Sequence, residues 1–296
     1  MRKTVLRFLN RKIVDPVSAA IAWLLFQGVK RLPIVWASNF GGALARALGP
    51  RLPVHRVARD NLRAAFPEKS AAEIETVLTG MWDNLGRTFG EFPHLHELFE
   101  SDRLEVIGLD NAIALREDGL PGLLWSGHIG NWELISAGPG LAGLVMHRIY
   151  RRPNNPWMEW LFGQRGAVVE GELLPKGSRG ARRALALLKK GEHLGMLVDQ
   201  KMNDGIPVPF FGRIAMTAPA LVTFALRFDC PVVACRAVRL PGVRFRLEIS
   251  PPARFAATGD RHADELAGMT EINRILEGWI REHPEQWLWV HRRWPR

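Results

Sequence analysis

The chain has 296 residues, of which 47% are hydrophobic and 24% are charged. This length and composition suffice to bury a full core in one large domain with an appended segment, and they exclude an intrinsically disordered chain. The formal net charge is +10. This charge is distributed unevenly, so its position along the chain is more informative than its size.

The first 60 residues carry most of the positive charge, with eleven Lys or Arg residues against two Asp residues. Between these charges lie two uncharged apolar runs, residues 16–29 and 32–45, of 14 residues each. A helix needs about 20 residues to span a bilayer. Because Trp23 and Trp36 lie in these runs, we expect residues 1–48 to form helices that lie in the membrane interface and are attracted to anionic lipid.

Three other interpretations apply to this segment. A cleaved signal peptide is disfavoured because the apolar run starts late and no small-residue cleavage site follows Val29. A nucleic-acid-binding arm is disfavoured because the arginines are interleaved with long apolar runs. A single tilted membrane span remains open. The rest of the chain, residues 49–296, is predicted to be the globular domain.

Beyond residue 60, helical and extended patterns alternate, which predicts an α/β fold. Ser70 with Glu73 three residues later forms a capping-box pattern, which predicts a helix that continues to about Leu98. Strands are expected at residues 104–107, 120–125, 144–150, 193–198, 231–238 and 243–249. Helices are expected between most of them, at residues 111–116, 131–137, 156–165, 179–190, 218–228 and 264–282. A mixed central sheet flanked by helices is the simplest arrangement, and ligands bind such sheets at the carboxyl ends of strands.

Residues 126–133, Ser-Gly-His-Ile-Gly-Asn-Trp-Glu, form the most informative motif. His128 stands at a predicted strand-to-helix turn, and Glu133 follows five residues later. Gly127 and Gly130 permit a turn in which the carboxylate of Glu133 accepts a hydrogen bond from one ring nitrogen of His128. The other nitrogen would then take a proton from a substrate hydroxyl, and the amides at the helix N-terminus would hold an oxyanion.

The spacing alone is weak, because 9 histidines and 30 acidic residues give about one such pair by chance. A second pair exists, His55 and Asp60, in a basic stretch with no preceding strand. We interpret that pair as solvated helix surface. The strand and turn around His128 favour catalysis over a histidine that merely packs in a turn.

Other predicted strand ends also carry polar side chains. Tyr150, Arg151 and Arg152 follow one strand, Arg165 ends the next helix, and Asp199 with Gln200 follows another strand. The arginines suit phosphate or carboxylate, although each alone is more often a solvated surface charge. Asp199 would hold a substrate hydroxyl or an arginine, or cap a turn. Residues 205–213 would form an apolar loop that lines an acyl chain, or one that packs over the core.

The two cysteines, Cys230 and Cys235, are five residues apart, so an extended chain would direct them to opposite faces. We expect buried free thiols and a reducing compartment. A zinc site would need further ligands at suitable spacing beside the pair, and the sequence has none there. No metal or resident cofactor is therefore expected.

Several segments spread over nearly the whole chain form a recognisable set: residues 61–67, the His128–Glu133 segment, Tyr150 and Arg151, Asn155 and Pro156, Arg165, Asp199 and Gln200, residues 210–212 with Ala215 and Thr217, and residues 286–294. In these segments the chain resembles the bacterial lipid A biosynthesis acyltransferases (lauroyl and myristoyl, Kdo-dependent) within the lysophospholipid acyltransferase superfamily.

The resemblance implies a catalytic dyad of His128 and Glu133, with Arg165 and Asp199 as further site residues. We predict substrate-binding roles for Asn131, Tyr150, Arg151, Arg165, Asp199 and Gln200. In the family the donor is usually an acyl carrier protein thioester, with coenzyme A as the alternative, and the acceptor is a hydroxyl on the growing lipid A disaccharide. It also implies docking at the cytoplasmic face of the inner membrane.

The motif departs from that of glycerophosphate-type acyltransferases, because Gly127 replaces an Asn and the later Phe-Pro-Glu-Gly segment is missing. This argues against a glycerolipid acceptor. Acceptors among other lysolipids or glycolipids remain open. A membrane-bound thioesterase and a basic membrane-surface adaptor are the alternatives from other classes.

Overall fold

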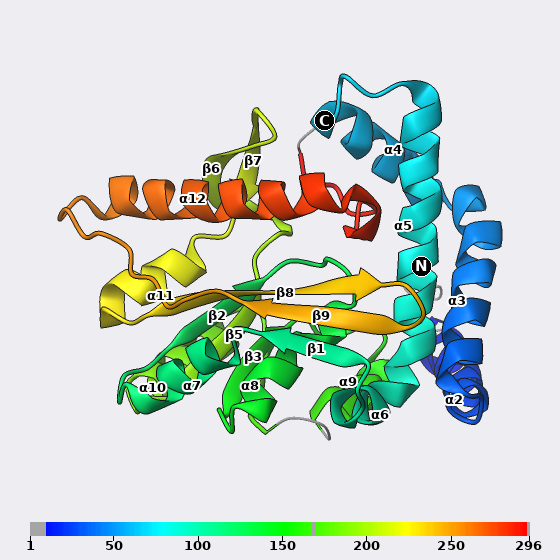
Figure 1. Cartoon of the computed structure of the whole chain (residues 1–296), viewed down its shortest axis with the longest axis horizontal. Helices are drawn as coiled ribbons and strands as arrows, with labels where there is room; N and C mark the ends of the chain where they lie inside the picture. The colour runs from blue at the N-terminus through cyan, green and yellow to red at the C-terminus, as the bar shows by residue number, and fades with distance from the viewer. Residues whose placement is uncertain (1–9, 167–169, 295–296) are drawn as a thin grey trace.

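The computed structural model describes residues 10–166 and 170–294. Its centre is a seven-stranded sheet (Figure 1) in which β8 and β9 pair antiparallel and all other neighbours pair parallel. In sheet order the strands are β1 (Leu104–Ile107), β9 (Arg244–Ile249), β8 (Val232–Leu240), β2 (Leu123–Ser126), β5 (His193–Leu197), β3 (Met146–Tyr150) and β4 (Leu173–Pro175). The mixed α/β fold is confirmed, and the six predicted strands lie within three residues of their observed bounds.

The sheet separates two hydrophobic cores, as the side chains of β2 show. Leu123 and Trp125 pack into one core and Leu124 into the other, because successive residues of a strand point to opposite faces. The first core is covered by α10 (Ser178–Leu188), α11 (Ala220–Phe228) and α12 (Arg261–Glu282), and the second by α6 (Leu95–Glu100), α7 (Leu109–Glu117) and α8 (Ala137–Leu141). Strand β2 is therefore buried on both faces.

Helices α3 (Ile34–Leu48) and α5 (Ala71–Glu91) pack along each other at one end of the sheet (Figure 1). Their contact is so close that a Cβ added to Gly41 would lie 2.2 Å from the carbonyl oxygen of Gly86. Ser70 and Glu73 form the predicted capping box at the start of α5. Helix α4 (Pro53–Ala65) joins α3 to α5. The proposed division of the chain at residue 48 stays a prediction.

Helix α2 (Asp15–Lys30) differs from α3 because it is largely exposed. By length and composition, the described residues contain one helix that is apolar enough to cross a membrane, Arg11–Lys30, and only 11% of its most apolar stretch is buried. Trp23 and Leu25 are among its exposed side chains. Both the interfacial arrangement and the single span are therefore compatible with this helix.

The apolar segment expected as a loop at residues 205–213 is instead most of an antiparallel hairpin, β6 (Lys201–Phe210) and β7 (Arg213–Thr217). Figure 1 shows it beside α12. Val208 and Phe210 are fully buried in the first core, so they pack the core and do not line a channel. The hairpin was missed because two prolines and a glycine in its first strand are typical of loops.

Both cysteines are buried and free, as predicted. Burial raises the pKa of the Cys230 thiol to about 11 and raises the pKa of Cys235 as well. These thiols are packing residues, because a reactive cysteine needs a lowered pKa.

Candidate active site

The loop that follows β2 carries His128, and the C-terminal segment holds it in place. The amide of Leu288 donates to the His128 carbonyl at 3.1 Å, and the amide of Gly130 donates to the Gln286 carbonyl at 3.0 Å. Gly130 has a φ of +58°, and a Cβ there would lie 1.7 Å from the carbonyl oxygen of Ala237. Only glycine fits this turn.

The carboxylate that faces His128 belongs to Asp199, which is fully buried. Its Oδ1 lies 2.8 Å from Nδ1 of His128, and its Oδ2 accepts from the His128 backbone amide, also at 2.8 Å. The pairing follows from the topology. Strands β2 and β5 are parallel neighbours with Ser126 opposite Leu197, so the residues after their carboxyl ends lie side by side.

Burial alone would raise the pKa of the Asp199 carboxyl, but the charge of the His128 imidazole and the hydrogen bonds from its ring and backbone amide outweigh burial and lower the pKa. The carboxylate is therefore ionised at neutral pH and accepts the Nδ1 proton. In the neutral form of this imidazole, Nε2 of His128 carries the lone pair. The His128 side chain is 15% exposed, and the side-chain amide nitrogen of Gln200 lies 3.4 Å from Nε2.

Two residues near the C-terminus complete this centre. Nε2 of His291 lies 3.3 Å from the Asp199 carbonyl oxygen, and burial lowers the pKa of His291 to about 4. The guanidinium of Arg293 is fully buried, where it donates to Thr217 Oγ1 at 2.8 Å and to the Met216 carbonyl at 3.1 Å. Burial lowers the pKa of Arg293 to about 10, so this side chain remains cationic at neutral pH.

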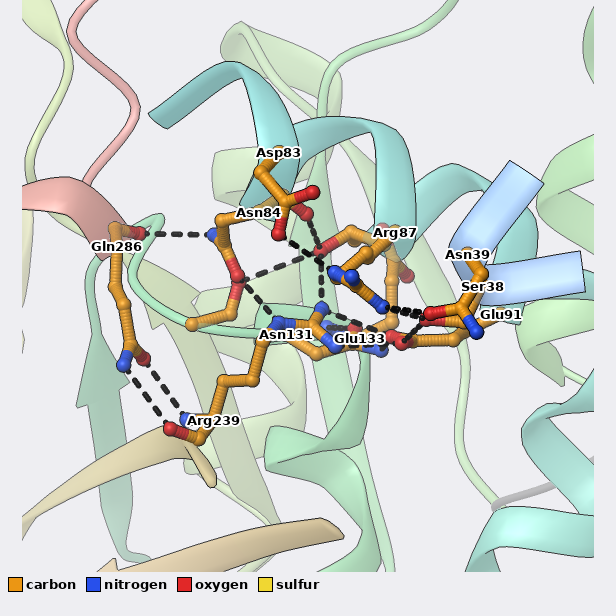
Figure 2. A network of polar contacts seen from close by, with 12 residues as sticks. Ser38, Asn39, Asp83, Asn84, Arg87, Glu91, Asn131, Glu133, Arg239 and Gln286 are labelled. Carbon is orange, nitrogen blue, oxygen red and sulfur yellow. Dashed lines mark hydrogen bonds and ion pairs between the residues drawn. The ribbon is translucent and has the colours of Figure 1, made fainter. Parts of the chain in front are cut away.

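On the other side of the loop a second buried carboxylate, Glu91, joins several elements (Figure 2). Arg239 of β8 donates to both of its oxygens, at 2.5 and 2.9 Å. Ser38 of α3 donates to it at 2.7 Å, and Asn131 donates at 2.8 Å. We call these four residues the Glu91 cluster. It connects α3, α5 and β8 to the segment that follows His128.

Comparisons with known proteins identify the family of this chain. The family model described as bacterial lipid A biosynthesis acyltransferase matches residues 5–296. The chain is 28% identical over 260 residues to the lipid A biosynthesis palmitoleoyltransferase of Escherichia coli strain K12, covering 85% of this chain and 81% of that protein. It is 25% identical over 285 residues to the lauroyltransferase of the same strain, covering 92% and 88%.

The chain belongs to the bacterial lipid A biosynthesis acyltransferase family. It is therefore an acyltransferase. Among solved structures, the 1-acyl-sn-glycerophosphate acyltransferase of Thermotoga maritima matches with a TM-score of 0.38 and 14% identity, covering 79% of this chain and 96% of that one.

In this acyltransferase the carboxylate partner of His128 differs from the predicted one. The sequence predicted Glu133, but within the described residues the ion pair of His128 is with Asp199. The segment after His128 forms a short 3₁₀-helix, Trp132–Ser136, capped by Asn131, in place of the expected α-helix. Oε1 of Glu133 accepts from the Trp132 indole at 3.0 Å. A catalytic role for Glu133 stays a prediction.

The predicted substrate-binding residues fall into separate groups. Asp199 and Gln200 lie at His128, whereas Asn131 is fully buried and uses its side chain within the Glu91 cluster and to cap the 3₁₀-helix. Arg151 is exposed beyond the end of β3, two strands away from β2, and the Tyr150 hydroxyl donates to Glu159 at 2.8 Å. Arg165 lies in α9 (Glu159–Gly166), and its side chain is outside the described residues.

His55, interpreted from sequence as solvated helix surface, is on a helix but is buried. The Trp82 indole donates to its Nδ1 at 3.0 Å, and burial together with the Arg59 charge lowers the pKa of His55. The physical reason is that α4 packs against α5. The pattern of polar residues within α4 alone does not predict this contact between helices. His291, Arg293 and Trp287 were assigned no site role from sequence, although residues 286–294 already carried part of the family resemblance.

Proposed function

We propose that this enzyme transfers a fatty acyl chain from an acyl carrier protein thioester to a hydroxyl of a lipid A precursor, with His128 as the general base. The observation that carries the proposal is the 2.8 Å contact between the buried Asp199 carboxyl group and Nδ1 of His128, which leaves Nε2 as the basic nitrogen. The names of the relatives, two lipid A acyltransferases of Escherichia coli, support the acceptor.

In the proposed mechanism, Nε2 of His128 accepts the proton of the acceptor hydroxyl as its oxygen attacks the thioester carbonyl. Asp199 stabilises the imidazolium that forms. When the tetrahedral intermediate collapses, the carbon–sulfur bond breaks and the imidazolium returns the proton to the leaving thiolate. Gln200 is near enough to Nε2 to contact the incoming hydroxyl.

The oxyanion site proposed from sequence needs one adjustment. The amides of His128, Ile129 and Gly130 already donate to Asp199, Gly127 and Gln286. We therefore propose that side chains that follow the strands next to β2, and not these amides, stabilise the oxyanion. Arg151 and Arg165 are the cations that we assign to the phosphates of the acceptor.

We also propose that the enzyme docks on the cytoplasmic face of the inner membrane, and the exposed apolar surface of α2 and α3 supports contact with a membrane. Trp36 is 71% exposed and Phe40 is 57% exposed, although both belong to a helix that packs on α5. Exposed aromatic side chains of this kind bury favourably in the interface of a bilayer. Replacing Trp36 and Phe40 together by Glu should abolish sedimentation with anionic vesicles without unfolding the protein, and unchanged sedimentation would contradict this docking.

An acidic donor protein would be attracted to the basic residues beyond the ends of β3 and β4. Arg151 and Lys176 are both exposed there, and the Lys176 amide donates to the Tyr150 carbonyl at 2.8 Å, so the two cations are on adjacent strands. Such charges raise association rates more than final affinity. Lys176→Glu should therefore weaken the use of acyl carrier protein more than the use of acyl coenzyme A, because Lys176 has no assigned role in binding the acceptor.

The decisive experiment measures acyl transfer from labelled acyl carrier protein to a Kdo-modified lipid A precursor. We expect transfer by the wild type and loss of transfer in His128→Ala. His96→Ala serves as the control, because the His96 side chain lies on α6 and is 69% exposed. Transfer by His128→Ala at the wild-type rate would refute the general base. Acyl release that is independent of added acceptor would instead support a thioesterase.

A further inference from the structure

The Asp199 carboxylate has a hydrogen-bond donor that comes from the far end of the chain. The indole Nε1 of Trp287 donates to Oδ2 at 2.8 Å, while Oδ1 faces Nδ1 of His128 at the same distance. Oδ2 also accepts the backbone amide of His128. Both oxygens are therefore satisfied, and the carboxylate is held between the imidazole and the indole.

Trp287 itself cannot turn away from the carboxylate. Its side chain is fully buried, and its ring lies edge-on to those of Trp289 and Phe210, with centroids 4.5 and 5.8 Å away. Its backbone forms an isolated β-bridge with Ile129, the residue after His128. The same residue thus fixes the backbone of the catalytic loop and the carboxylate that orients the imidazole.

We infer that Trp287 is a positioning residue: its indole N–H fixes the plane of the Asp199 carboxylate and thereby sets the orientation and proton affinity of His128. The inference rests on the proposed general-base role of His128. Two donors on Oδ2 withdraw charge from the carboxylate and aim Oδ1 at the imidazole. Without the indole donor, Asp199 would rotate more freely and hold the proton on His128 more strongly.

The charged and titratable groups around this carboxylate come from two segments of the chain. His128 lies on the loop after β2, and His291 and Arg293 lie in the C-terminal segment. Asp199 itself follows β5. Arg293 keeps its charge across the range of an activity assay. A shift in the pH profile of a Trp287 variant at neutral pH therefore reports on His128.

The chain offers a matched control for Trp287. Trp289 is equally buried and packs edge-on against Trp287 and Phe66, but its indole donates to the Pro284 carbonyl at 2.7 Å and not to Asp199. Trp287→Phe and Trp289→Phe each delete one buried indole N–H and keep a large aromatic ring. The two variants should therefore lose similar thermal stability, while only one changes the carboxylate.

The test measures kcat, KM, the pH profile of kcat/KM and thermal stability for both variants. Trp287→Phe should lower kcat about 10- to 100-fold with little change in KM. It should also move the acid limb of the profile to higher pH. Trp289→Phe should keep the wild-type profile. Wild-type kcat and pH profile in Trp287→Phe, or equal kcat losses in both variants without a pH shift, would overturn the inference.

A substrate-free measurement separates this inference from the proposed function. Nitrogen-15 NMR of labelled histidine follows the titration of the His128 ring directly, and His128→Gln identifies its signal. If the wild type transfers no acyl chain, the proposed function fails, but a His128 titration moved to higher pH in Trp287→Phe and unmoved in Trp289→Phe still supports positioning. An unmoved titration in Trp287→Phe refutes it.

Discussion

Two fully buried carboxylates flank the loop that carries His128, and they differ in their partners. Asp199 faces the imidazole of His128, the indole of Trp287 and a backbone amide. Glu91 faces the guanidinium of Arg239, with Ser38 and Asn131. Both carboxylates are fully buried and satisfied by hydrogen bonds, so burial and hydrogen bonding do not distinguish them.

The difference between the two sites is the chemistry of the cation. A guanidinium keeps its proton throughout the functional pH range, whereas an imidazole gains and loses one near neutrality. The pair of Asp199 and His128 can therefore take part in proton transfer, while the Glu91 cluster fixes α3, α5 and β8 to the catalytic loop. Burial of a carboxylate beside a loop is thus insufficient to identify catalysis, because its partner decides the role.

The contrast between a catalytic Asp199 and a structural Glu91 would be wrong if Asp199 had only a structural role. Asp199→Asn keeps the shape but removes the charge that holds Nδ1–H, so acyl transfer should fall about 10³- to 10⁴-fold in the folded protein. Kinetic assays with circular dichroism check this, and Asp204→Asn, an exposed change on β6, is the control. Activity within tenfold of the wild type would remove Asp199 from the mechanism.

Glu91→Gln tests the opposite assignment. It leaves Arg239 buried without its counter-charge, which should cost about 3–5 kcal/mol of unfolding free energy. Chemical denaturation measures this loss, and Glu100→Gln, at a side chain that is 69% exposed, should stay within about 0.5 kcal/mol of the wild type. At a temperature where the variant remains folded, its kcat should fall far less than that of Asp199→Asn; an equal fall would erase the contrast.

The free energy of unfolding should also depend on pH, because His291 is buried beside Asp199. The pKa of His291 is lowered to about 4 in the folded protein, against about 6.5 when unfolded. Between these values the unfolded chain binds the additional proton, so stability is full above about pH 6.5 and falls towards pH 4, by at most about 3 kcal/mol. Denaturation across this range should show a shallower slope in His291→Gln, and an unchanged slope would assign the pH dependence to other groups.

Ser38→Ala gives the smallest expected effect and sharpens the role of the Glu91 cluster. It removes the hydroxyl that α3 donates to Glu91, which should cost about 1–2 kcal/mol of unfolding free energy. Hydrogen exchange should show more opening of α3 than of α12. A uniform loss of protection over both helices would contradict the view that this hydroxyl specifically attaches α3, the helix that exposes Trp36.

Residue patterns predicted much of the architecture and part of the site. Strand ends were found where apolar runs meet turn residues, which located His128, Asp199 and Gln200 separately. The prediction that Glu133 contacts the imidazole relied on spacing along one short segment. In the structure that segment begins as a 3₁₀-helix, and the carboxylate bound to Nδ1 comes from the neighbouring strand, 71 residues away.

The sequence by itself determined the α/β class, the apolar N-terminal helices, the buried free thiols and the turn that presents His128, because these depend on local hydrophobic period and turn chemistry. Only the tertiary structure decided that Asp199 faces His128, that Trp287 reaches Asp199 across 88 residues of chain, and that Glu91 binds Arg239. Such pairs depend on which strands are neighbours and on how the C-terminus returns to the sheet. Those choices are made by packing of the whole core, and no short segment of the sequence encodes them.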